Sequence, residues 1–316
     1  MAKRPLRVLT WHIHGSYLSY LAHVPHTFYL PTKPGKPEGY GGRLAGFDWP
    51  DNVRDIPADD VHRTAFDCIL FQSHKNYTTD QYEILSDQQR RLPRIFLEHD
   101  PPRDTPTDTR HVVDDPAVLL VHVTHFNQLM WDSGRTPSRV IEHGVTIPAD
   151  VHYSGEIEKG ITIVNGLARR GRRLGRDVFD CARHTVPLDL VGMCAAELGG
   201  VGEIPHRDLP AVAARYRFFF NPIRYTSLGL AVCEAMMVGL PIIGLATTEM
   251  ATVVQNGVNG FVDTNLGTLV RHMQRLIEDP VEARALSVHA ARYARERFGI
   301  ERFVHDWDRI FSAVCG

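Results

Sequence analysis

The residues with the clearest chemical potential lie between Asn221 and Val262. A predicted strand is followed there by a short polar turn and then by a helix that begins near Gly229. The first N–H groups of a helix have no partner within it, so an anion can bind there, and glycine allows close approach. Glu234 follows on the same helix among apolar neighbours, and a buried carboxylate needs hydrogen-bond donors. The pattern predicts a site that binds phosphate and contacts hydroxyl groups.

A run of arginines is the second candidate. It extends from Asn165 to Asp177, reads NGLARRGRRLGRD, and follows the predicted strand Ile161–Val164. Guanidinium groups match phosphate oxygens, and open α/β sheets bind ligands at the carboxyl ends of their strands. The run therefore predicts a diphosphate site. A solvated basic patch or an RNA contact is the alternative that the pattern leaves open.

The elements that must position these groups are predicted by apolar runs that alternate with amphipathic stretches. Near-continuous apolar strands separated by helices indicate parallel sheets covered on both faces. Two such series predict two doubly wound domains, residues 1–150 and 151–298, followed by a C-terminal helix at 299–316. The predicted strands are Arg7–Trp11, Cys68–Phe71, Arg94–Leu97, Val118–Val123, Arg139–Glu142, Ile161–Val164, Leu188–Val191, Phe218–Asn221 and Pro241–Leu245.

The segment Pro25–Pro57 is rich in proline and glycine and is too long for an ordinary connector. We expect either a mobile acceptor loop or an insertion packed on the surface. Its basic and aromatic residues also suggest contact with a membrane surface, although the same residues also suit a plain loop. They are Lys33, Lys36, Tyr40, Arg43, Phe47 and Trp49.

Composition excludes several classes of protein. The chain has 316 residues, 43% of them apolar, and a formal net charge of -2, so no nucleic-acid partner is expected. Its five cysteines show no paired spacing, which fits a reducing cytoplasm. No signal peptide or membrane-spanning run is predicted, and peripheral contact at the inner membrane face stays open. His12 and His14 lack the partners and spacing of a metal site, so no metal is expected.

Residues 221–262 resemble the donor-binding signature of retaining GT-B glycosyltransferases of the family 4 type. The matching segments are Glu234-Ala235-Met236, Gly239-Leu240-Pro241 and Asn256-Gly257 through Gly260. The chain departs from the family at Thr226, where a glutamate is usual, and at Leu174, where a lysine is usual. The resemblance implies an α/β chain of two Rossmann-like domains facing a cleft, with the last helix crossing back to the N-terminal domain.

The resemblance also implies roles for individual residues. Glu234 would accept hydrogen bonds from the nucleotide ribose, and Arg169 would bind the diphosphate with help from Arg173 or Arg172. His99 would lie near the transferred sugar. The residues assigned to catalysis are Arg169, Arg173 and His99. The residues assigned to donor binding are Gly15, Arg172, Ile204, Thr226, Ser227, Leu228, Gly229, Leu230, Glu234 and Glu249.

The function implied is transfer of a sugar from a nucleotide-diphosphate sugar, with retention of configuration and without a metal or other cofactor. The acceptor is left open between a glycan, a lipid and a small metabolite, and the oligomeric state is not predicted. The changes at Thr226 and Leu174 motivate an alternative, a non-catalytic relative that binds a nucleotide or sugar. A GT-B sugar-nucleotide epimerase is a further alternative.

Overall fold

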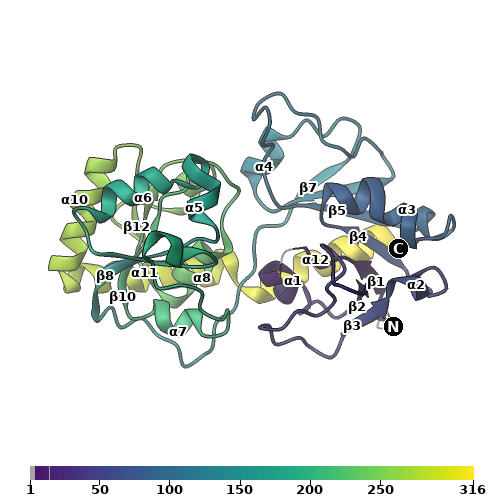
Figure 1. Ribbon diagram of the computed structural model, residues 1–316, viewed down its shortest axis with the longest axis horizontal. Helices are drawn as coiled ribbons and strands as arrows, with labels where there is room; N and C mark the ends of the chain where they lie inside the picture. Colours follow the sequence, from purple (N-terminus) through teal and green to yellow (C-terminus); the bar gives the residue numbers. More distant parts are fainter. Residues whose placement is uncertain (1–3, 14) are drawn as a thin grey trace. The chain divides into compact units, whose positions relative to one another are not determined.

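The computed structural model describes residues 4–13 and 15–316 and divides into two compact units (Figure 1). His14, one of the histidines considered above, lies outside the described residues. Unit 1 contains the chain up to Gly144 together with Ile300–Gly316, and unit 2 contains Val145–Gly299. The chain therefore ends in the unit where it begins. Both units are parallel α/β structures, which confirms the predicted fold class.

Unit 1 is built on a seven-stranded parallel sheet with the order β3-β2-β1-β4-β5-β6-β7. Four strands contain largely buried apolar residues, as expected for a sheet covered on both faces. The strands are β1 (Arg7–Thr10), β2 (Thr27–Thr32), β3 (Val53–Pro57), β4 (Cys68–Phe71), β5 (Arg94–Glu98), β6 (Val118–His122) and β7 (Ser138–Val140).

The helices of unit 1 cover this sheet. They are α1 (Gly15–Leu21), α2 (Ala58–Val61), a π-helical turn (Asn76–Asp80), α3 (Gln81–Ile84), a 3₁₀ turn (Gln89–Arg91), α4 (His125–Met130) and α12 (Ile300–Cys315). The last helix, α12, contacts α1, and its buried residues Phe303, Trp307 and Phe311 form an apolar stripe. The Trp307 indole N–H donates to the Tyr17 hydroxyl at 3.1 Å. Aromatic packing thus ties the two ends of the chain together.

The segment Pro25–Pro57 differs from the expectation of a loop or surface insertion. It contains two strands of the sheet, and β2 lies between β1 and β3. Phe28 and Leu30 of β2 are fully buried, and Phe28 packs on Phe311 of α12 with ring centroids 6.2 Å apart. The expectation was wrong because β2 and β3 are short and each contains a proline, which conceals a strand in the sequence.

Unit 2 has a five-stranded parallel sheet with the order β12-β11-β10-β8-β9. Its strands are β8 (Ile157–Ile163), β9 (Leu188–Val191), β10 (Tyr216–Asn221), β11 (Ile242–Leu245) and β12 (Gly260–Asp263). The sequence analysis did not predict β12. Gly260, its first residue, lies so close to Ile242 that an added Cβ would be 2.0 Å from the Ile242 carbonyl oxygen. The glycine of the Asn-Gly loop is therefore required where the loop joins the sheet.

Helices cover both faces of the unit 2 sheet (Figure 1). Helices α6 and α10 pack together on one face, and α7, α8 and α11 lie on the other. The helical segments are α5 (Leu167–Arg170), a 3₁₀ turn (Gly171–Leu174), α6 (Arg176–Arg183), a 3₁₀ turn (Ala195–Leu198), α7 (Leu209–Ala213), α8 (Leu230–Val238), α9 (Met250–Val253), α10 (Leu266–Glu278) and α11 (Pro280–Phe298). This arrangement leaves the carboxyl ends of the strands to the loops.

Candidate functional site

The arginine-rich loop of unit 2 follows β8 and is bonded to the loop that follows β10. Gly175 has a φ of +80°, and a Cβ there would lie 1.8 Å from the carbonyl oxygen of Pro222. The backbone N–H groups of Arg224 and Tyr225 donate to the Arg173 carbonyl at 3.1 and 3.3 Å. The two predicted parts of the site are thus neighbours, and only glycine permits their close approach.

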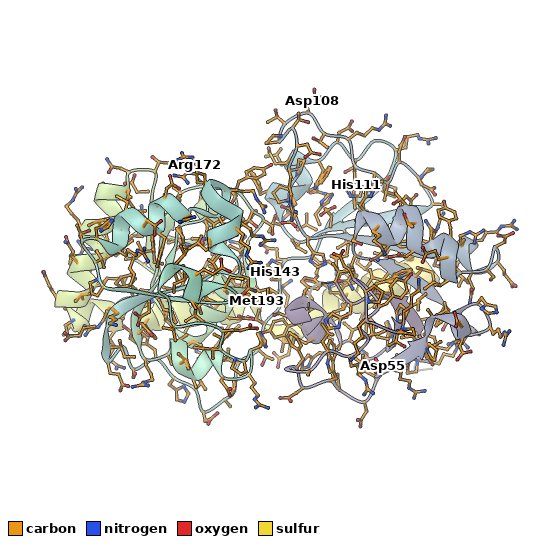
Figure 2. The ribbon with its side chains drawn as sticks, viewed as in Figure 1. Asp55, Asp108, His111, His143, Arg172 and Met193 are labelled. Carbon is orange, nitrogen blue, oxygen red and sulfur yellow. The ribbon has the colours of Figure 1, made fainter. Side chains whose placement is uncertain are left out.

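The arginines of this loop are exposed and bonded to acidic side chains. Arg169 has 70% of its side chain exposed and donates to Glu197 Oε1 at 2.7 Å. Arg172, on the surface of unit 2 in Figure 2, donates to Asp177 Oδ2 at 2.5 Å. Arg224 reaches both oxygens of Asp177 at 2.5 and 2.8 Å, and its hydrogen bond is the main cause of the lowered pKa of Asp177. The loop therefore presents cations that are already oriented.

Leu174, at the family's lysine position, faces the protein interior. It is 4% exposed and packs with Leu167, Val178 and Phe179 in the core beneath α6. A lysine-like contact with a ligand from position 174 is therefore not available in this chain. A second cation, if one is needed, must come from a neighbouring arginine such as Arg173 or Arg172.

The N-terminus of α8 follows the polar turn, as predicted. Gly229 is the N-cap residue, with φ −67° and ψ 134°, so neither Thr226 nor Ser227 caps the helix. Ser227 and Leu228 are buried, and the Ser227 carbonyl accepts a hydrogen bond from the Thr248 hydroxyl at 3.3 Å. The Thr248 side chain thus helps to hold the turn, and Leu230 begins the helix, whose first N–H groups have no partner within it.

Glu234 lies on the second turn of α8 and is bonded to a histidine that the sequence analysis did not single out. His206 Nε2 is 2.9 Å from Glu234 Oε1, and the side chains are 25% and 15% exposed. Burial acts to lower the pKa of His206, but the hydrogen bond and the charge of Glu234 outweigh it and raise that pKa. Glu234 is thus a mostly buried carboxylate with a hydrogen-bonding imidazole partner, in line with the need for donors that its apolar neighbours predicted.

Ile204 and Glu249 have different surroundings. Ile204 is half-buried in the loop that leads from β9 to α7. Glu249, at the start of α9, is 3% exposed and accepts hydrogen bonds from the Thr252 hydroxyl at 2.8 Å and from Arg297 at 3.2 Å. The role of Glu249 toward a donor sugar stays a prediction, because these contacts already explain its burial.

Unit 1 has a polar network where β1, β4 and β5 end. His99 Nε2 lies 3.2 Å from Gln72 Oε1, and its ring packs edge-on against Tyr17 with centroids 4.8 Å apart. The Gln72 amide donates to the Thr10 hydroxyl at 2.9 Å and to the Trp11 carbonyl at 2.8 Å. His99 is therefore placed by a side chain that spans two strands. Its part in catalysis stays a prediction.

Gly15 begins α1 next to an aromatic cluster. A Cβ at this position would lie 2.7 Å from the Phe47 ring and 3.2 Å from the Nε2 atom of His12. His12 donates through Nδ1–H to the Gly42 carbonyl at 2.6 Å, and its ring packs edge-on against Trp49 with centroids 5.2 Å apart. The packing within unit 1 is thus sufficient to explain why glycine occupies position 15.

The basic and aromatic residues of the segment Pro25–Pro57 do not form a continuous exposed patch. Tyr40 is 1% exposed, Lys33 pairs with Glu83 at 2.7 Å, and Arg43 pairs with Asp55 at 3.4 Å. Within the described residues, none of the helices is both long and apolar enough to span a bilayer. Membrane contact therefore stays a prediction.

A metal site would require several ligand side chains close together. Among residues 4–13 and 15–316, the His, Cys, Asp and Glu side chains form no group of three or more suited to a metal ion.

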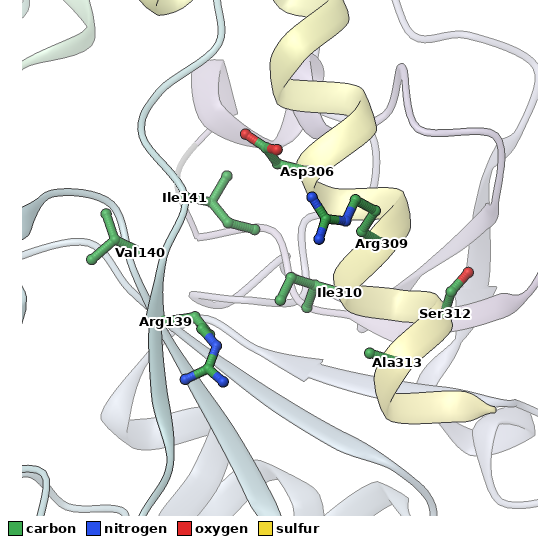
Figure 3. A pocket seen from close by; sticks show the side chains of 8 residues that line it. All are labelled: Arg139, Val140, Ile141, Asp306, Arg309, Ile310, Ser312 and Ala313. Atoms are coloured by element: carbon green, nitrogen blue, oxygen red, sulfur yellow. The ribbon is translucent and has the colours of Figure 1, made fainter.

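A groove of about 640 Å³ lies between β7 and α12 in unit 1 (Figure 3). Arg139, Val140 and Ile141 line one wall, and residues of α12 line the other. None of the predicted site residues lines this groove.

Comparisons with known proteins match one part of the chain to a described family. Residues 195–279 match the family model described as "Glycosyl transferases group 1". A sucrose synthase from Thermosynechococcus vestitus is 32% identical over 82 residues, which are 24% of this chain and 10% of that protein. The match thus spans only a tenth of the length of this relative.

Solved structures resemble the chain over nearly its whole length. A sucrose-phosphate synthase from Thermosynechococcus elongatus matches with a TM-score of 0.71 and 15% identity, covering 98% of this chain and 99% of that one. HepE from Anabaena in complex with UDP matches with a TM-score of 0.70 and 16% identity, covering 98% and 100%. A glycosyltransferase from Rickettsia africae gives 0.71 and 11%, covering 99% of both chains. The chain therefore has the GT-B fold seen in glycosyltransferases, and its residues 195–279 match the group 1 family model.

Proposed function

We propose that the protein is a glycosyltransferase that moves a sugar from a nucleotide-diphosphate sugar to an acceptor, with retention of configuration and without a metal. The observation that carries this proposal is the junction of the two loops of unit 2. It brings the arginine-rich loop beside the N-terminus of α8, and Glu234 lies on that same helix. The match to a group 1 family model over 195–279 supports it.

Each part of the junction has a distinct role in the proposal. The departing diphosphate gains negative charge as the sugar–phosphate bond breaks, and oriented cations and helix N–H groups stabilise such charge. Arg169 and Arg173 would supply the cations with Arg172, and the N–H groups after Gly229 would face the phosphate. A Cβ at Gly229 would meet no atom within 4 Å, so packing within the chain does not require glycine there. Close approach of a ligand is a reason for glycine at this position.

The nucleoside part would be held by Glu234 and by the loop that contains Ile204. HepE has been solved in complex with UDP and with UDP-glucose, which makes a uridine donor the first to test. In this proposal Thr226 takes the place of the family's glutamate at the sugar, and its hydroxyl group accepts or donates one hydrogen bond. A shorter and uncharged side chain changes which sugar is held best.

A second candidate function is a non-catalytic relative that binds the nucleotide sugar without transferring it. The burial of Leu174 favours it, because one of the family's cations is absent from the site. An assay of nucleoside diphosphate release separates the two, using UDP-glucose, GDP-mannose and ADP-glucose with the wild type. Release above the uncatalysed rate, which Arg169→Ala abolishes, supports a transferase. Binding without release supports the non-catalytic relative.

A further inference from the structure

The contact between His206 and Glu234 joins two elements that are distant in sequence. His206 lies in the loop before α7, and Glu234 lies on α8, which packs against α7. The imidazole Nε2 is 2.9 Å from Glu234 Oε1, within the range of a charge-assisted hydrogen bond. Because both side chains are largely covered, water screens this contact less than it screens a surface ion pair.

The backbone around His206 is fixed by a tight turn. The Pro205 carbonyl accepts hydrogen bonds from the N–H groups of Asp208 at 2.9 Å and Leu209 at 3.2 Å, and the His206 carbonyl lies 3.3 Å from the same Leu209 nitrogen. Pro210 then occupies the first turn of α7, where proline suits the geometry. The imidazole is thus presented from a rigid turn and not from a loose loop.

The bond has a consequence for the carboxylate. A mostly buried carboxylate is costly to keep ionised unless hydrogen-bond donors compensate it, and the imidazole N–H of His206 is one such donor. An ionised carboxylate has about four acceptor positions, so a bond to Oε1 from one side leaves capacity for hydroxyl donors. The direction of the His206 bond also sets the plane in which the remaining lone pairs point.

We propose that His206 is a positioning residue for the nucleoside half of the donor: it holds the Glu234 carboxylate in the orientation that accepts hydrogen bonds from the ribose hydroxyl groups. This inference rests on the proposed function, because it needs a nucleotide at Glu234. It assigns no chemical step to His206, which acts on the ligand only through the carboxylate. Its effect is therefore on binding of the nucleoside and not on the rate of the chemical step.

The test is a thermodynamic cycle that combines one amino-acid substitution with one change to the ligand and measures whether their effects on Kd are additive. Calorimetric titration would measure the Kd of wild type and His206→Ala for UDP, GDP and ADP, and for the 2′,3′-dideoxy form of each base that binds. For the ribose form, His206→Ala should raise Kd about tenfold, since a hydrogen bond to a charged group is lost. For the dideoxy form, which has no ribose hydroxyl groups, the same substitution should change Kd less than about twofold.

Two controls separate positioning from general damage. His206→Gln retains an N–H donor near the Nε2 position and should restore most of the affinity for the ribose form. His184→Ala removes an exposed histidine at the end of α6 in the same unit and should leave every Kd unchanged. In assays of transfer, His206→Ala should raise KM for the donor and leave kcat within about twofold.

The outcomes separate the positioning role of His206 from the proposed function. An equal loss of affinity for ribose and dideoxy ligands in His206→Ala overturns the positioning role while the proposed function stands. An unchanged Kd for both ligands in His206→Ala also overturns the positioning role and leaves the proposed function standing. Failure of the wild type to bind any of the three nucleoside diphosphates overturns both the positioning role and the proposed function.

Discussion

In unit 2 the loops after the strands carry exposed charged side chains, whereas in unit 1 the loops carry imidazole, amide and phenol groups that are mostly buried. Arg169 and Arg172 of unit 2 have 70% and 77% of their side chains exposed, each with an acidic partner. Gln72 and Tyr17 of unit 1 are only 3% and 2% exposed. Two parallel α/β sheets of different strand order therefore present two kinds of edge, one with exposed charges and one with a buried polar network.

The contrast between exposed charges in unit 2 and buried polar groups in unit 1 is what we expect if the two sheet edges bind different parts of the substrates. A diphosphate is strongly solvated, so its site works best with cations that are already charged and oriented. A neutral hydroxyl acceptor is recognised by hydrogen bonds that are lost if the groups are misplaced, so a rigid and buried network serves it. On this account unit 2 holds the donor, and the network around His99 in unit 1 holds the acceptor side of the reaction.

The largest expected effect on activity concerns Arg169, the exposed arginine of unit 2. Arg169→Ala should lower kcat/KM about 100-fold, or about 3 kcal/mol, because a preorganised charge at the leaving diphosphate is lost. The melting temperature should stay unchanged, since the side chain is exposed and its bond to Glu197 is a surface ion pair. Steady-state kinetics and a thermal melt measure the two effects. Arg170→Ala, the exposed neighbouring arginine, is the matched control, and an equal loss in that variant would contradict a specific role.

A substitution at Gly175, where the loops after β8 and β10 of unit 2 meet, is expected to lower the stability of the protein. Gly175→Ala should lower the free energy of unfolding by about 3 kcal/mol, from a left-handed backbone and a clash with the Pro222 carbonyl. Gly199→Ala shares the left-handed backbone, with φ +70° and ψ 23°, but has no atom within 4 Å of the added Cβ, so it should cost only about 1 kcal/mol. Denaturant unfolding compares the two. Equal costs would show that the loops are not held in close contact.

Unit 1 offers a pH test of its buried polar character. Burial, with a smaller contribution from neighbouring His111, lowers the pKa of His122 to about 3. The folded state therefore keeps His122 neutral, while the unfolded state takes up a proton below about pH 6.5. Acidification from pH 6 to pH 4 should lower stability by up to about 1.4 kcal/mol per pH unit through this one group.

The variant His122→Leu removes that titration and should flatten the loss of stability between pH 6 and pH 4, whatever its effect at neutral pH. His125→Leu, at an exposed position on α4, should retain the wild-type slope. Denaturant unfolding at a series of pH values gives both slopes. An unchanged slope in His122→Leu would mean that His122 is protonated or solvated in the folded protein.

The smallest expected effect concerns the acid that holds Arg169. Glu197→Gln should release Arg169 for the diphosphate and lower the Kd of a nucleoside diphosphate by about threefold, because an exposed ion pair is worth less than about 1 kcal/mol. The effect should diminish at high salt, which screens both partners. Titration at two ionic strengths measures it. A weaker affinity in Glu197→Gln would instead assign Glu197 to holding Arg169 in place.

The parts of the molecule that were predictable from sequence have strong local signals. The apolar runs of β4, β9 and β10 and the glycine before α8 are visible without any tertiary information. By contrast, β2 contains Pro31 and β12 begins within an Asn-Gly loop, so tertiary pairing overrides local propensity in both.

The candidate site divides in the same way. Glu234 and the arginine run were predicted from residue type and position, but His206 was not, although its segment was singled out. The direction of an imidazole depends on the packing of α7 against α8, which no local pattern reveals. The inward orientation of Leu174 was hidden for the same reason, because an apolar residue in a basic loop is ambiguous until the core is known.

The measurement that tests the central claim most directly is thermal unfolding of the wild type with UDP, GDP, ADP and their common sugar conjugates. A ligand that binds the folded state at a hundred times its Kd stabilises the protein by about 2.7 kcal/mol. The account predicts a clear rise in melting temperature with one base, reduced in Arg169→Ala and in Glu234→Ala. No rise with any nucleotide, or an equal rise in both variants, would contradict a donor site at the carboxyl edge of the unit 2 sheet.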